Sequence, residues 1–329
     1  MDRKTVAITM GDPCGIGPEI CLKAVRDKRV LRACIPVIFG DAAVLSQIST
    51  KLHIPFPANV VIATDLATCP ALERCTIVDC SPTYGHLSLK AHKSTSAGGT
   101  ASFCYIKAAL NAVQTGKACA IVTAPISKES LSLAGIAYPG HTEMLTALTK
   151  SRSSCMMMAS DRINVSLVTT HTSYMRAGRE ISADKISRVI DLTEQVMRKR
   201  LGRKPRLTVC ALNPHAGENG LFGDEEHRII RPAIRTAIKK GINIIGPLPA
   251  DTAFISKTRE STDAYIAMYH DQGLIPFKML SFDDGVNVTL GLPIVRTSVD
   301  HGTAFDIAHK GKASCESLVQ AIILALRLS

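Results

Sequence analysis

The sequence predicts an α/β protein of about two domains, and three observations support this. The chain has 329 residues, which exceeds the ~150 residues of an ordinary single core. Hydrophobic residues make up 46% of it, enough to fill a substantial interior. Short apolar runs alternate with longer segments of helical spacing, and this alternation is typical of a mainly parallel sheet covered by helices.

The first part of the chain begins with a strand, a glycine-rich turn and a helix. The β-branched run Thr5 to Met10 stops at Gly11, and a helical stretch follows from Pro18 to Val25. The segment Ala97 to Thr115 carries small and apolar residues at helical spacing, so we expect a helix that crosses between strands. Three further strands are predicted here, at Ile35 to Phe39, Val60 to Ala63 and Cys119 to Thr123.

The alternation continues after Pro125. Four strands are expected in this part, at Asn164 to Thr170, Leu207 to Leu212, Ile242 to Ile245 and Ala264 to Tyr269. Three helices are expected, at Ser182 to Lys199, Glu225 to Lys240 and Ser314 to Leu328. No internal repeat, low-complexity segment or flexible linker interrupts the pattern, so we expect the two domains to be joined by continuous secondary structure.

The formal net charge of +11 raises the question of a nucleic-acid partner. Basic residues are spread along the chain, and only Met197 to Lys204 is dense. Aromatic residues make up 4% and tryptophan is absent, so few side chains could stack on bases. We expect no nucleic-acid partner, because positive charge serves equally well to attract a phosphorylated metabolite or a dinucleotide.

The sequence also predicts a cytoplasmic protein with no membrane contact. Its first residues run from charges directly into a strand pattern, without the apolar core of a signal peptide. No apolar run approaches the roughly 20 residues that span a bilayer. The eleven cysteines form no C-x-x-C pair and fit no metal or disulfide spacing, so we expect most of them to be small buried side chains in a reducing compartment.

Three histidines, His171, His215 and His270, each stand just beyond the end of a predicted strand. In open α/β sheets, ligands bind outside the carboxyl ends of the strands, and neutral imidazole is the commonest metal ligand. Their separations of 44 and 55 residues fit no short zinc motif. Spacing alone therefore leaves both a metal site and three unrelated histidines open.

The stretch Tyr269 to Lys310 is the richest in functional groups, since it contains His270, Lys278, Asn287 and Arg296. This mixture favours a site that holds an anion, binds a metal or transfers a proton. The alternative is a surface loop with solvated charges.

The segment Tyr138 to Leu145 places His141 and Thr142 after a Pro-Gly turn and before an apolar helical run. Thr142 fits a helix cap. The Thr142 hydroxyl and the N–H groups at the start of a helix would also form a phosphate-binding site, provided that Lys278 and Arg296 lie close to it.

Two glycine-rich segments are expected to be shaped turns. In Asn213 to Glu226 the acidic residues fit the first turn of the following helix, with Asp224 as its cap, which leaves a functional role to His215 and Asn213. Gly11 to Glu19 contains G-x-G without the full dinucleotide spacing, so a tight turn that packs a helix on a strand is the favoured interpretation.

Seven motifs in order resemble the 4-hydroxythreonine-4-phosphate dehydrogenase (PdxA) family over essentially the whole chain: GDPCGIGPE, VTAPISKE, YPGHTEML, NPHAGENGLFGDEE, GPLPADTAF, MYHDQGLIPFK and HGTAFDIAHKGKA. Several are especially similar to the D-threonate 4-phosphate dehydrogenase branch of that family. One departure is Cys14, where the family usually has alanine, a change that is conservative in size.

The resemblance implies a fold of two α/β/α domains with a central cleft, similar in plan to isopropylmalate and isocitrate dehydrogenases. It implies a homodimer with the active site at the interface. We expect a cofactor-side domain at 1–125 plus 300–329, and a domain for metal, substrate and dimerisation at 126–299.

The resemblance also assigns residues. One divalent metal per subunit (Zn, Mg, Co or Mn) is expected at His171, His215 and His270, with ligands from both subunits. Substrate contacts are expected at His141, Thr142, Lys278, Asn287 and Arg296, and contacts with NAD or NADP at His301, Gly302, Thr303, Ala304 and Asp306. The candidates for catalysis are Lys278, His141 and Asp251, the last expected near the metal.

The implied reaction is metal-dependent, NAD(P)-linked oxidation of the C3 hydroxyl of 4-phosphooxy-L-threonine. Decarboxylation of the resulting β-keto acid to 3-amino-2-oxopropyl phosphate follows, as in pyridoxal phosphate biosynthesis. The alternative substrate is D-threonate or D-erythronate 4-phosphate in sugar-acid catabolism, which would give dihydroxyacetone phosphate and CO2. A hydrolase or isomerase that uses the same histidines, and a basic nucleic-acid-binding protein, are the rival classes.

Overall fold

The computed structural model describes residues 3–66, 72–81 and 92–329. Cys69, one of the eleven cysteines, lies outside these residues. The chain divides into two compact units, of which unit 1 comprises Met1–Lys150 with Leu292–Arg327 and unit 2 comprises Ser151–Gly291.

These bounds differ from the expected domain bounds at 125/126 and 299/300, and packing explains the difference. Leu131 and Met144 belong to one apolar cluster with Ile106 and Leu110, so residues 126–150 pack with unit 1. Residues 292–299 contain a strand that pairs with a strand of that unit.

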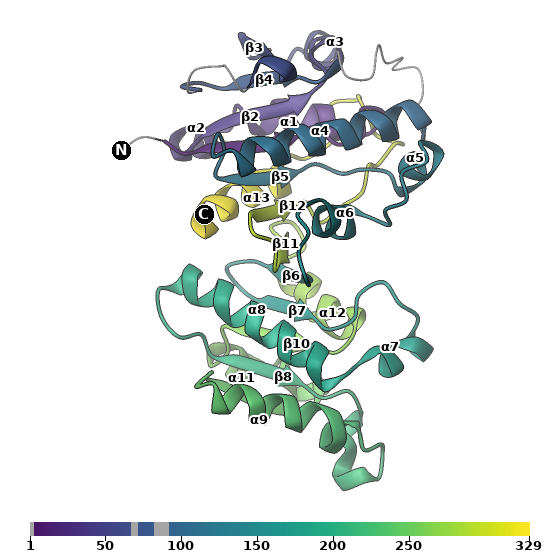
Figure 1. The fold of residues 1–329 in the computed structure, drawn as a ribbon, viewed down its shortest axis with the longest axis vertical. Coiled ribbons are helices and arrows are strands. Elements are labelled where there is room, and N and C mark those ends of the chain that lie inside the picture. Colours follow the sequence, from purple (N-terminus) through teal and green to yellow (C-terminus); the bar gives the residue numbers. More distant parts are fainter. Residues whose placement is uncertain (1–2, 67–71, 82–91) are drawn as a thin grey trace. The chain divides into compact units, whose positions relative to one another are not determined.

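Unit 1 has a parallel six-stranded sheet in the order β3-β4-β2-β1-β5-β12 (Figure 1). The strands predicted at β1, β2, β3 and β5 are confirmed, whereas β4 and β12 were missed. Both missed strands have only four residues. The bounds are β1 Thr5–Thr9, β2 Ile35–Gly40, β3 Asn59–Ile62, β4 Thr76–Asp79, β5 Ala120–Thr123 and β12 Val295–Ser298.

Several helices of unit 1 begin where a side-chain oxygen caps their first N–H groups. Asp41, Thr95 and Ser127 accept hydrogen bonds from the backbone at the starts of α3, α4 and α5. Helix α4 packs on β1, β2 and β5, as a crossover helix should. The bounds are α1 Gly17–Ala24, α2 Lys28–Ala33, α3 Ala42–Leu52, η1 Ala63–Asp65, α4 Ser96–Gln114, α5 Lys128–Leu133, α6 His141–Leu148 and α13 Glu316–Leu328.

Unit 2 has a mixed sheet in the order β11-β6-β7-β10-β8-β9. Strands β7, β10, β8 and β9 are parallel, as expected. Strand β6 runs antiparallel to both of its neighbours, which the alternation rule did not predict. The bounds are β6 Cys155–Ala159, β7 Asn164–Leu167, β8 Leu207–Cys210, β9 Ile244–Leu248, β10 Ala264–Ala267 and β11 Val286–Leu290.

The helices of unit 2 include α12, His270–Leu280, where the sequence predicted no helix. Gly273 is required by close packing, since a Cβ atom there would lie 2.6 Å from Val165 Cγ1 on β7. Within the described residues, no helix could span a membrane. The bounds are α7 Tyr174–Glu180, α8 Ala183–Leu201, η3 Pro214–Gly220, η4 Glu226–Ile230, α9 Arg231–Lys239, α10 Ala250–Ala253, α11 Ser256–Glu260 and α12 His270–Leu280.

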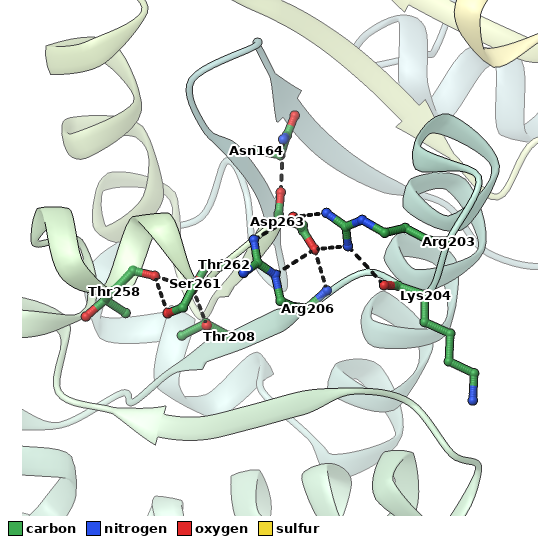
Figure 2. Close-up of polar contacts among 9 residues, drawn as sticks. All are labelled: Asn164, Arg203, Lys204, Arg206, Thr208, Thr258, Ser261, Thr262 and Asp263. Carbon is green, nitrogen blue, oxygen red and sulfur yellow. Dashed lines mark hydrogen bonds and ion pairs between the residues drawn. The ribbon is translucent and has the colours of Figure 1, made fainter.

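The dense basic run at the end of α8 forms ion pairs within unit 2. Arg203 donates to both oxygens of Asp263, at 2.8 and 2.9 Å. Figure 2 shows Arg206 reaching the same carboxylate through its guanidinium and its backbone N–H, the latter at 2.7 Å. Burial acts to raise the pKa of Asp263, but these hydrogen bonds outweigh it and hold that pKa well below its usual range. The cluster joins the residues that precede β8 to those that precede β10.

Candidate active site

Two of the three strand-end histidines come together in unit 2. Strands β7 and β10 are parallel neighbours, so the residues beyond their carboxyl ends lie at one edge of the sheet. The ring centroids of His171 and His270 are 5.9 Å apart. Both line a cavity of about 270 Å³, together with Thr170, Thr172, Tyr174, Ala177, Tyr269 and Asp271.

Asp271 fixes the ring of His270. Its Oδ1 lies 2.6 Å from His270 Nδ1, and its Oδ2 accepts a hydrogen bond of 2.5 Å from the hydroxyl of Tyr174. Both hydrogen bonds lower the pKa of Asp271, and the bond from Tyr174 has the larger effect. Because Nδ1 is engaged, Nε2 is the nitrogen of His270 that remains for an external ligand.

His215 lies in a different environment. It begins a run of left-handed backbone that extends to Asn219, with φ of 52° at His215 itself, and its ring centroid is 5.9 Å from that of Phe222. Among the described residues, no three His, Cys, Asp or Glu side chains are grouped so that they could hold a metal ion. The structure thus pairs His171 with His270 and does not bring His215 to them within one chain.

Glu226 lies in the first turn of the following helix, η4, as expected, and it also shapes the loop that carries His215. Glu226 is 3% exposed, and its Oε1 accepts from the backbone N–H groups of Leu212 and Asn213 at 2.8 and 2.7 Å. Asp224 is not a cap, because its carboxylate pairs with Arg228 instead. These two N–H donors satisfy Oε1 of the buried Glu226 carboxylate.

Arg296 of β12 is a buried cation in unit 1. It is 2% exposed, and its Nη2 donates to Thr123 Oγ1 on the neighbouring strand β5 at 2.7 Å. Burial lowers the pKa of this guanidinium to about 9, an effect that the nearby Glu143 partly opposes. A buried guanidinium of this kind favours the binding of an anion.

The start of α6 carries His141 and Thr142. Gly140 occupies the cap position, so the interpretation of Thr142 as the cap is wrong, and Thr142 lies in the first turn. His141 Nε2 is buried and has no hydrogen-bond partner among the described residues. Burial, and then the charge of Arg296, lower the pKa of His141 well below its usual range, so its ring is neutral at physiological pH.

The remaining expected contacts belong to unit 2. Lys278 is in the last turn of α12, with Nζ 5.3 Å from the ring centroid of Phe282. Asn287 lies on β11, and its Oδ1 is buried without a partner among the described residues. Asp251 is exposed in the first turn of α10.

The expected cofactor segment packs on the first βα turn of unit 1. Ile16 N donates to Thr303 O at 2.9 Å. A Cβ atom at Gly15 would lie 2.8 Å from the same oxygen, and one at Gly17 would lie 2.0 Å from Met10 O, which confirms the interpretation of a tight turn. The segment leaves three of its expected contacts exposed, namely His301, Gly302 and Asp306.

A neutral imidazole, a buried guanidinium and a pair of histidines at a sheet edge are typical of an α/β enzyme that acts on a small anionic metabolite. The sequence profile of the family described as Pyridoxal phosphate biosynthetic protein PdxA matches residues 32–325. The chain therefore belongs to the PdxA family, and the expectations of an α/β fold and of a dehydrogenase are confirmed.

Individual relatives agree with this assignment. The 4-hydroxythreonine-4-phosphate dehydrogenase of Desulfosudis oleivorans is 46% identical over 326 residues, which cover 98% of this chain and 96% of the relative. The D-threonate 4-phosphate dehydrogenase of Salmonella typhimurium is 44% identical over 339 residues, which cover 100% of both. The crystal structure of 4-hydroxythreonine-4-phosphate dehydrogenase from Klebsiella pneumoniae matches with a TM-score of 0.87 and 40% identity over 99% of both chains.

Proposed function

We propose that this dehydrogenase oxidises the C3 hydroxyl of a four-carbon acid phosphorylated at C4, and that the β-keto acid formed then loses CO2. Both named groups of relatives act on acids of this kind. The observation that carries the proposal is the buried Arg296, because a phosphate dianion would compensate its charge. Thr142 and the N–H groups of the first turn of α6 would add donors.

The first candidate substrate is 4-phosphooxy-L-threonine, which would give 3-amino-2-oxopropyl phosphate. The second is D-threonate or D-erythronate 4-phosphate, which would give dihydroxyacetone phosphate. The second candidate is kept because a relative that acts on D-threonate 4-phosphate aligns with the whole chain.

A divalent metal is proposed at His171 and His270, with His215 as the third ligand. The pair fits this role, because Asp271 engages Nδ1 of His270 and so leaves Nε2 for the ion. When bound, such an ion supplies Lewis-acid polarisation of the substrate's oxygen at C3. The separate position of His215 supports ligands from two copies of the chain.

The residues of the chain itself would move the protons. His141 is neutral, and its buried Nε2 has no partner among the described residues, so it can accept a proton from the C3 hydroxyl. The ammonium group of Lys278 can return a proton to carbon after CO2 leaves. Asn287 would hold the substrate through Oδ1, and Asp251 remains a third catalytic candidate.

A nicotinamide cofactor, NAD or NADP, is proposed at His301, Gly302, Thr303, Ala304 and Asp306. The exposure of three of these residues supports access for a large ligand. A bound nicotinamide supplies the acceptor for the hydride that leaves C3.

A homodimer is proposed from the outer side of α12. Ile275, Met279 and Phe282 are 60%, 80% and 71% exposed; Ile275 and Met279 lie one turn apart on α12, and Phe282 follows just beyond its end. Ile275 and Met279 lie on the helix that carries His270 and Lys278, so a second copy of the chain that packs on this apolar surface would lie close to the proposed metal ligands.

The decisive experiment follows NAD(P) reduction with each phosphorylated acid in turn. We expect absorbance to rise with one of the 4-phosphorylated acids and not with its dephosphorylated form, and to stop when the metal is chelated. Turnover without a change in absorbance would indicate a hydrolase or isomerase and refute the proposal.

A further inference from the structure

The segment 301–313 contains no helix or strand, so other parts of unit 1 must hold it in place. Helix α1 does so through Glu19, which is 0% exposed. Its Oε1 accepts from Ala313 N at 2.9 Å, and its Oε2 accepts from Gly311 N at 3.1 Å. The carboxylate therefore receives backbone donors from the downstream end of the segment.

Lys23, one turn further along α1, completes this contact. Its Nζ donates to Glu19 Oε1 at 2.7 Å and to the carbonyl oxygens of Gly311 and Ala313 at 3.0 and 2.7 Å. The pair thus binds the N–H and the C=O of the same two residues. This arrangement compensates a charge whose burial would otherwise be costly.

The residues just before α1 hold the upstream part of the same segment. Ile16 N donates to Thr303 O at 2.9 Å, and His309 Nε2 donates to Pro13 O at 3.1 Å. Residues 13–23 therefore contact the segment 301–313 at four of its positions. These contacts anchor the segment to α1 and to the turn before it.

We propose that Glu19 and Lys23 are positioning residues for the nicotinamide cofactor, because they fix the backbone on which His301 to Asp306 are presented. The inference rests on the proposed placement of the cofactor at those residues. An ion pair that served only to stabilise α1 would be expected on the exposed face of that helix, where it would add little to the stability of the protein. A fully buried carboxylate that binds a distant loop instead defines the position of that loop.

The test compares Glu19→Gln with Glu194→Gln, which alters an i, i+4 pair with Arg198 on α8 of unit 2. NADH and NADPH affinities are measured by fluorescence titration without substrate, and the KM of the phosphorylated acid at saturating cofactor. We expect Glu19→Gln to weaken cofactor binding about tenfold and to leave the substrate KM within about twofold. The control variant should change neither.

Lys23→Met serves as a second variant, because the Lys23 side chain is 26% exposed and its removal leaves Glu19 in place. If Glu19→Gln does not fold, Lys23→Met alone decides the question, with the same expected loss of cofactor affinity. Unchanged cofactor affinity in a folded variant, or equal losses for cofactor and substrate, would overturn the inference.

Asp306→Ala separates this inference from the proposed function. If Asp306→Ala weakens the cofactor and neither Glu19→Gln nor Lys23→Met does so, only the positioning role is refuted. If Asp306→Ala and His301→Ala both leave cofactor affinity unchanged, the placement of the cofactor is refuted and the positioning role with it.

Discussion

Replacing Arg296 with methionine is expected to stabilise the free protein and to weaken its hold on a phosphorylated substrate. Arg296 is 2% exposed, and its Nη2 donates a hydrogen bond to Thr123 Oγ1. Methionine has a similar length and flexibility, so it can fill the space without a charge. The two expected effects have opposite signs, which distinguishes a binding residue from a structural one.

The magnitude follows from the pKa of Arg296. The lowering of this pKa from its usual value to about 9 corresponds to roughly 5 kcal/mol at about 1.4 kcal/mol per pKa unit, as an upper limit. Loss of the bond to Thr123 offsets about 1–2 kcal/mol of this. The upper limit is thus about 3–4 kcal/mol, and we expect the free energy of unfolding to rise by about 1–3 kcal/mol, as is found when other buried ions are replaced by apolar side chains. Substrate binding should weaken by roughly 30-fold or more.

The effect also has a predictable dependence on pH. The folded pKa of Arg296, about 9, lies below its unfolded value, so above about pH 9 the unfolded chain binds more protons than the folded one. Below about pH 9 Arg296 therefore lowers the stability of the free protein by its full amount, and the stability rises as pH increases beyond that value. The stability of the methionine variant should show no such rise.

Urea unfolding at pH 7 and pH 9.5, together with the KM for the phosphorylated acid, tests the reasoning. The matched control is Arg228→Met, which removes an exposed arginine paired with Asp224 and should change stability by less than about 0.5 kcal/mol. A less stable Arg296→Met protein with an unchanged KM would show that Arg296 is structural.

Three further changes test other parts of the structure. Asp263→Asn should lower the free energy of unfolding by about 1–3 kcal/mol at pH 7; because the folded pKa of Asp263 is depressed, its stabilising effect is present above the usual carboxyl range and lost as pH falls through the folded pKa. Urea midpoints at pH 7 measure this, and an unchanged midpoint would contradict it. Asp271→Asn should weaken zinc or cobalt binding by about 10- to 100-fold in calorimetric titrations, whereas unchanged affinity would separate Asp271 from any metal. Chelation should abolish turnover, and added Zn, Co, Mn or Mg should restore part of it; full activity of a metal-free preparation would remove the metal from the mechanism.

The sequence predicted the parallel strands well where they are long and apolar, because burial on both faces leaves a continuous run such as Ile35–Gly40. It failed at α12, where Gly273 and Pro276 have the composition of a loop. The reason is tertiary, since Gly273 lets the helix approach β7 more closely than any other residue could. Local propensity cannot report such a contact.

The strand-end rule was informative at the candidate site, and its limits are physical. It anticipated that His171 and His270 would be neighbours, because β7 and β10 pair in parallel. It could not anticipate the left-handed backbone that carries His215 to Phe222. The buried Glu226 accepts hydrogen bonds from the residues just before that backbone, and no periodicity reveals these bonds.

Three acidic residues illustrate what sequence patterns miss. Glu19, Glu226 and Asp263 each accept N–H groups from another segment, across 292, 14 and 57 residues respectively. Sequence patterns assign an acidic residue near a helix start to that helix, because they use only residues that are close in sequence. A carboxylate accepts several donors, and desolvation makes each donor more valuable when the carboxylate is buried. Such an acid therefore defines where two distant segments meet, and in unit 1 those segments are α1 and the proposed cofactor segment.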